Sequence, residues 1–79
     1  MDNYRIEEVF DAGKINCNEL IKNIYIRMSN LRSGQILEVI SYDLGAIEDI
    51  PAWCRMQGHK LLDVKEDGLF KTHFIIQKR

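Results

Sequence analysis

The spacing of apolar residues predicts one clear helix in the first half of the chain. Between residues 19 and 32, apolar side chains recur at intervals of three or four positions: Leu20, Ile24, Met28 and Leu31. This is the period of one face of an α-helix. Gly34 follows where a left-handed C-terminal cap is favoured. Residues 19–32 are therefore expected to form a helix that turns one face toward a core.

Four shorter apolar segments are typical of strands. Residues 4–10 alternate imperfectly, and residues 35–41 are mostly apolar and rich in branched side chains, as in a buried central strand. Residues 60–65 and 69–77 flank Asp67-Gly68, a dipeptide that favours a hairpin. Gly13 and Lys14 are expected to form the turn after the first strand.

A second helix is predicted between the middle strand and the hairpin. Apolar residues from Ile47 to Met56 recur at helical spacing, and Gly58 ends the segment. Pro51 is tolerated only in a first helical turn, so the regular helix is expected to begin near Asp49, after a looser turn. The order β-α-β-α-β-β predicts an α/β (α+β) two-layer sandwich, with both helices on one face of a four-stranded mixed sheet.

The length and the net charge of the chain argue against several classes of function. The 79 residues suffice for a single domain over residues 1–79, and a chain this short leaves little room for a large internal cavity. The formal net charge is −1, which gives no bulk attraction to nucleic acid or to an anionic membrane. No apolar run is long enough to span a bilayer, and the first residues do not resemble a signal peptide. The cytoplasm is the expected location.

Cys17 is the strongest candidate for chemistry. It lies where the turn gives way to the first helix, and the unpaired N–H groups and dipole of a helix N-terminus favour a thiolate. Asn16 and Glu19 have the spacing of a capping box, and Asn18 is an alternative N-cap. Burial as a small apolar residue is the other interpretation of Cys17. Its polar neighbours favour an exposed, reactive thiol.

The remaining conspicuous residues are expected to be structural. Cys54 is predicted on the inner face of the second helix, and Trp53 beside it is predicted to support the fold. His59 either begins a strand or approaches the thiol, and the first is favoured. His73 is predicted on the surface. The spacing of the cysteines and histidines fits no zinc site, and no third residue completes a Cys-His hydrolase.

Several motifs resemble the TusA-like (SirA-like) family of sulfur carriers over nearly the whole chain. Asp11 stands six residues before Cys17, at the family spacing, and Ile15 takes the apolar place between them. Residues 34–39 are similar to the family's G-x-x-L-x-V strand. Residues 49–54 and the pair Gly58-His59 are similar to its second helix and the Gly-His that follows.

The match departs from the family around the thiol. The family's Cys-Pro-x-Pro motif would place proline at positions 18 and 20, where this chain has Asn18 and Leu20. Lys14 also stands where the family has glycine. The chain thus looks like a variant that keeps the cysteine and lacks the prolines.

The resemblance implies a sulfurtransferase component that carries a persulfide on Cys17, rather than a stand-alone enzyme. It would accept sulfur from a donor such as a cysteine desulfurase and pass it to an acceptor protein, as a monomer without metal or organic cofactor. One alternative is a non-catalytic RNA-binding or regulatory interaction module. It would require a basic face, and the candidates for one lie on the last hairpin, where Asp63, Glu66 and Asp67 dilute them: Lys60, Lys65, Lys71, Lys78 and Arg79. Another alternative is a relative that kept the fold and lost transfer.

Overall fold

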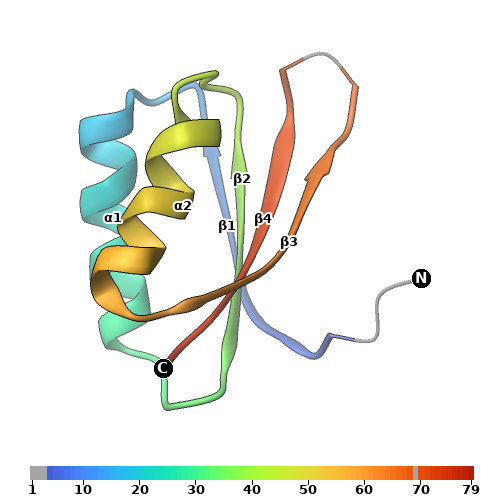
Figure 1. Cartoon of the computed structure of the whole chain (residues 1–79). Helices are drawn as coiled ribbons and strands as arrows, with labels where there is room; N and C mark the ends of the chain where they lie inside the picture. The colour runs from blue at the N-terminus through green and yellow to red at the C-terminus, as the bar shows by residue number, and fades with distance from the viewer. Residues whose placement is uncertain (1–3, 69) are drawn as a thin grey trace.

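The structure, a computed structural model, describes residues 4–68 and 70–79, and of Cys17 it describes the backbone alone. Six elements follow one another along the chain (Figure 1): β1 (Ile6–Gly13), α1 (Cys17–Ser29), β2 (Ile36–Ser41), α2 (Ala46–Gln57), β3 (Lys60–Glu66) and β4 (Thr72–Gln77). The predicted order β-α-β-α-β-β is confirmed.

The four strands form one mixed sheet in the order β1-β2-β4-β3. β1 and β2 are parallel, whereas β4 is antiparallel to both of its neighbours. Figure 1 shows α1 and α2 side by side on the same face of the sheet, and the opposite face is not covered by a helix. The predicted α+β two-layer sandwich is therefore confirmed.

The core lies between the two helices and the covered sheet face. In β2 and β4, alternate residues are fully buried because successive side chains point to opposite faces. They meet in register: Leu37 opposite Ile76, Val39 opposite Phe74. The helices close this core with residues at a spacing of three or four: Leu20, Ile24 and Met28 from α1, and Ala46, Ile50 and Cys54 from α2.

The ends of α1 differ from the prediction. The helix begins at Cys17 and ends at Ser29, with Asn30 as a C-cap in right-handed conformation. Gly34 was wrongly placed as the cap. It lies in the connection to β2 with a φ of +90°, and its N–H donates to the carbonyl of Lys78 at 2.8 Å. The positive φ, in a connection that pairs with the end of the chain rather than in a helix cap, accounts for the glycine at that position.

α2 begins at Ala46, three residues earlier than predicted. The N–H groups of Ala46, Ile47 and Glu48 all bond three residues back, and Asp49 is the first to bond four residues back, to Gly45. The looser first turn that Pro51 suggested is therefore present, but as part of the helix. Gly58 ends α2 with a φ of +81°, as predicted.

Two strand boundaries also differ. β1 runs to Gly13, beyond the apolar run, because Gly13 pairs with Ser41 of β2. β4 begins only at Thr72; of the residues predicted to open it, Leu69 lies outside the described residues and Phe70 has a φ of +68°. The hairpin between β3 and β4 is confirmed, with a connection longer than two residues.

Candidate functional site at the start of the first helix

The loop before α1 is fixed by bonds within the chain. The Asp11 carboxylate accepts a hydrogen bond from the Gly13 N–H at 3.0 Å. Gly13 has a φ of +62°, which a glycine adopts at little cost. Its carbonyl accepts from the N–H of Tyr42, just after β2, at 3.0 Å. Ile15 then packs against the core. The segment that delivers Cys17 is thus held to two neighbouring strands.

Asn16 is the N-cap of α1, as the sequence predicted. Its backbone is extended, its side-chain oxygen accepts from the Glu19 N–H at 3.0 Å, and its carbonyl accepts from the Leu20 N–H at 2.9 Å. Asn18 lies inside the helix, so the alternative N-cap is wrong. The carboxylate half of the predicted capping box is not among the hydrogen bonds of the described residues.

Cys17 is the first helical residue, and its side chain lies outside the described residues. The position of its backbone at the helix N-terminus is enough to describe the electrostatic potential near residue 17. The first N–H groups of a helix have no acceptor within the helix, and the helix dipole adds partial positive charge at the same end. Both effects favour an anion beside residue 17.

The two positions at which this chain lacks the family's prolines have different environments. Asn18 is exposed on the first turn, whereas Leu20 is fully buried in the core. A core leucine therefore replaces the second proline.

Cys54 is a core residue, as predicted. Its side chain is 1% exposed and packs in the cluster between α2 and the sheet. Burial raises the pKa of the Cys54 thiol to about 11, an effect that the nearby positive charge of Arg55 only partly opposes. At neutral pH this thiol is protonated and unreactive.

His59 lies at the far end of the helix layer from Cys17. It borders a pocket formed with Met28 and Ser29 at the end of α1, and Met28 is roughly 16 Å along the helix axis from Cys17 at about 1.5 Å per residue. The His59 ring lies 5.4 Å from the ring of Trp53, and its Nδ1 accepts from the Arg79 N–H at 3.2 Å. Burial, followed by the charges of Lys78 and Arg79, lowers the pKa of His59. The predicted structural role, together with that of buried Trp53, fits this packing, and an approach to the thiol does not.

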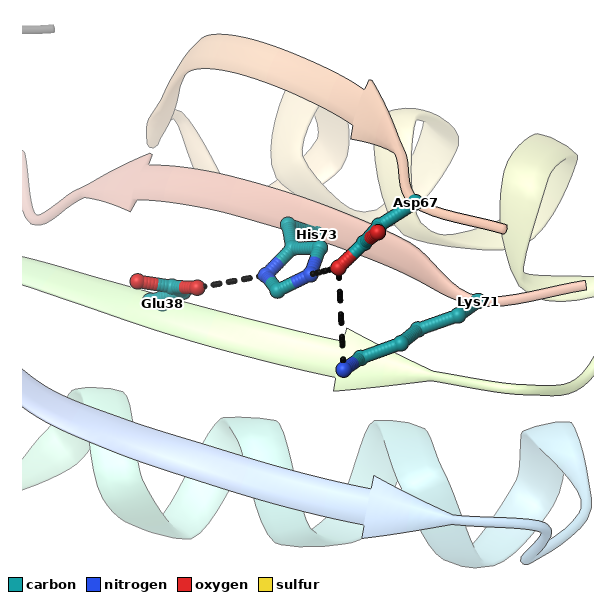
Figure 2. Close-up of polar contacts among 4 residues, drawn as sticks. All are labelled: Glu38, Asp67, Lys71 and His73. Carbon is teal, nitrogen blue, oxygen red and sulfur yellow. Dashed lines mark hydrogen bonds and ion pairs between the residues drawn. The ribbon is translucent and has the colours of Figure 1, made fainter.

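A polar network on the uncovered sheet face was not anticipated. His73 was predicted as a plain surface residue, but its side chain is only 19% exposed. Figure 2 shows it between two carboxylates: Nδ1 lies 2.6 Å from Glu38 and Nε2 lies 3.4 Å from Asp67, which also pairs with Lys71 at 3.7 Å. This network is not arranged as a metal site: across residues 4–68 and 70–79, no three His, Cys, Asp or Glu side chains are placed so that they could hold a metal ion together.

The pairing of β2 with β4 brings this network together, and no local sequence signal connects Glu38 to His73. Alternation along each strand places both side chains on the uncovered face. Their strands, however, are adjacent in the sheet only because β4 inserts between β2 and β3. Carboxylates on this face also weaken the RNA-binding alternative, which gains no support.

The chain is similar to known sulfur carriers over most of its length. The family model described as "Sulfurtransferase TusA" matches residues 8–78. A sulfur carrier protein TusA from Pseudomonas putida strain GB-1 is 36% identical over 78 residues, which cover 99% of this chain and 98% of that protein. One from Allochromatium vinosum is 35% identical over 72 residues, covering 91% and 93%. The putative sulfur carrier protein YrkI of Bacillus subtilis is 40% identical over 62 residues, covering 78% and 83%.

Neither helix of the described residues is long and apolar enough to span a bilayer. The matched range includes both helices and all but the first residues of the sheet, and it includes Cys17. With a family model over nearly the whole chain and relatives above 30% identity at almost full coverage, this chain belongs to the TusA family.

Proposed function

We propose that this protein is a sulfur carrier that holds a sulfur atom as a persulfide on Cys17. The relatives named as sulfur carrier proteins support the general role. The observation that carries the choice of residue is the start of α1: the helix begins at Cys17, directly after an N-cap whose side chain bonds Glu19.

A helix start suits both forms of the cysteine. The thiol must lose its proton to act as a nucleophile, and partial positive charge at a helix N-terminus lowers the pKa of a cysteine there. The persulfide that forms is also an anion, and N–H groups at a helix N-terminus stabilise anions. The same backbone therefore favours the carrier before and after loading.

The transfer is an exchange between sulfur atoms. The Cys17 thiolate attacks the outer sulfur of a persulfide on the donor protein. The bond between the donor's two sulfurs breaks, the donor leaves as a thiolate, and Cys17 becomes Cys17-S-SH. A thiolate of the acceptor then attacks the outer sulfur of Cys17-S-SH and releases the Cys17 thiolate. No external oxidant or reductant is consumed.

We place the carrier in the cytoplasm, as a monomer between a cysteine desulfurase and an acceptor protein. A reducing compartment keeps both cysteines as thiols. The exchange itself calls for no metal or organic cofactor.

Mass spectrometry tests the proposal directly. The protein is incubated with a cysteine desulfurase and cysteine, and the peptides are analysed without reductant. We expect an addition of about 32 Da, one sulfur atom, on the Cys17 peptide. C17S should show no adduct, and C54S should keep it. An adduct on Cys54, or one that survives in C17S, would refute the assignment.

A further inference from the structure

Three large apolar side chains are exposed at one end of the molecule. Leu44 precedes α2 and is 58% exposed, Ile47 in its first turn is 40% exposed, and Phe70 in the β3–β4 turn is 58% exposed. They line one open groove of about 280 Å³, with Glu66 and Lys71 at its border. Two separate segments of the chain thus contribute to one apolar surface, which we call the 44/47/70 groove.

The backbone of Phe70 has an unfavourable conformation, and no contact of its ring within the core offsets the cost. Among residues 4–68 and 70–79, Phe70 is the one non-glycine residue with a positive φ, +68°. A bulky side chain is a clear outlier there, and such a conformation costs free energy that glycine or asparagine largely avoids. The ring remains exposed, so core burial does not offset the cost. A contact made outside the monomer would account for an aromatic residue in this position.

The 44/47/70 groove lies at the same end as the start of α1. The strand register aligns Gly13, Ser41, Thr72 and Glu66 across the sheet. Gly13 is four residues before Cys17, and Thr72 is two residues after Phe70. Two strand spacings, roughly 10 Å, separate Gly13 from Thr72. Figure 1 shows the start of α1, the segment before α2 and the β3–β4 turn at one end of the sandwich.

A protein that exchanges sulfur with Cys17 docks within reach of the groove. Direct transfer requires the two sulfurs to touch, so the partner lies against this end. A standard interface buries about 800 Å² on each partner, a patch roughly 30 Å across. The whole molecule measures 31 × 29 × 18 Å. An interface of ordinary size centred near Cys17 reaches the groove.

We propose that the 44/47/70 groove is the docking site for the persulfide-donating protein, a cysteine desulfurase that inserts an apolar side chain into it. The inference rests on the proposed role of Cys17. Carboxylates outnumber the lysine at this end of the molecule. Glu66 and Lys71 both line the groove, Lys71 is paired with Asp67, and the exposed Glu48 and Asp49 follow Ile47 in the first turn of α2. Because complementary charge guides docking, the matching surface of the donor is basic around its apolar side chain.

The test separates docking from the chemistry of the thiol. The double variant L44N/F70N removes two apolar side chains, and asparagine tolerates the left-handed backbone at position 70. M56N is the matched control, since Met56 is 80% exposed near the other end of α2. Each protein is loaded from two sources: a cysteine desulfurase turning over cysteine, and glutathione persulfide, which needs no docking. The rate of sulfur addition to Cys17 is measured against donor concentration.

We expect L44N/F70N to load from the desulfurase at least about tenfold more slowly at low donor concentration, as for the loss of central interface side chains. Loading from glutathione persulfide should be unchanged, and M56N should match the wild type with both donors. Raising the salt concentration should slow desulfurase loading of the wild type, because the charges around the groove become screened.

Three outcomes would overturn the docking site: equal desulfurase rates for L44N/F70N and the wild type, equal losses with both sulfur sources, or a wild type that loads from glutathione persulfide but from no desulfurase. Failure of the proposed function gives a different result, since wild-type Cys17 would then take up sulfur from neither source. A wild-type dimer that L44N/F70N dissociates would assign the groove to a second copy of this chain and would also overturn the proposal.

Discussion

The two cysteines of this chain occupy different positions in the fold. Cys54 is buried between α2 and the sheet, in surroundings that disfavour its thiolate. Cys17 begins a helix, where the backbone favours an anion. The difference arises from placement, because the side chains are chemically identical.

Alkylation should therefore distinguish them. At pH 8, a thiol with a pKa of about 11 is ionised to about one part in a thousand. We expect iodoacetamide to modify Cys17 much faster than Cys54 in the folded protein, and both at similar rates in urea. Peptide mass spectrometry over time measures the two rates. Equal rates in the folded protein would contradict the expectation.

Replacing the less reactive cysteine, Cys54, with serine should cost more stability than replacing the more reactive one, Cys17. C54S buries a hydroxyl in an apolar cluster and should lower the free energy of unfolding by about 1–3 kcal/mol. C17S should change it little, since serine is accepted at the start of a helix. Urea unfolding of both variants measures the difference. The reverse order would mean that Cys17, rather than Cys54, depends on burial.

At the scale of the element, the start of α1 decides the site. Asn16 supplies the cap, Asp11 accepts a hydrogen bond from Gly13 in the preceding loop, and Leu20 is fully buried in the core. Residue 18 lies in the first turn, where no intrahelical bond to its N–H exists. A proline at position 18, where the Cys-Pro-x-Pro motif would place one, therefore breaks no hydrogen bond within the helix.

Restoring that proline tests the boundary. We expect N18P to fold normally, with a change in the free energy of unfolding within about 1 kcal/mol, because proline fits a first turn and restricts the unfolded chain. N16A, which removes the cap, should cost about 0.5–2 kcal/mol. Chemical denaturation followed by circular dichroism measures both. A loss of about 3 kcal/mol in N18P would mean that the helix begins a turn earlier and that Cys17 lies inside it.

At the scale of the whole molecule, the helices cover one face of the sheet and enclose the core, and the opposite face has no helix over it. Cys54 belongs to the closed core, so its ionisation is linked to folding. Its pKa is about 11 in the folded chain and 9.0 as the ordinary value. Below pH 9 both states keep the proton and the linkage contributes nothing. Between pH 9 and 11 the unfolded chain loses it first, which stabilises the unfolded state.

The free energy of unfolding should consequently fall as the pH rises from 9 to 11, by about 2–3 kcal/mol from this residue. Other groups also titrate in this range, so the test is the difference between the wild type and C54A. Urea unfolding at several pH values should show a steeper loss for the wild type. Parallel curves for the two proteins would show that Cys54 is not coupled to folding.

Local sequence patterns were sufficient to predict the order of the elements and the residues at the start of α1. The apolar spacing in α1, the branched residues of β2 and the Asp67-Gly68 turn all act over a few neighbouring residues, so the presence and order of their elements were predicted correctly, although several boundaries were not. The N-cap Asn16 and the position of Cys17 at the helix start were predicted in the same way, because a helix cap is a local structure. Gly34 and the start of β4 were misplaced, since distant pairing with Lys78 and the backbone of Phe70 set them.

The sequence by itself determined the element order, the buried Cys54 and the cysteine at the helix start, because periodicity and capping depend on neighbours in the chain. Only the tertiary structure decided that β4 lies between β2 and β3. That arrangement joins His73 to Glu38 and sets Leu44 and Ile47 beside Phe70. These contacts join residues more than 20 positions apart. The strands that bring them together pair through backbone hydrogen bonds. Because the backbone groups are the same in every residue, the local sequence does not show which strands will pair.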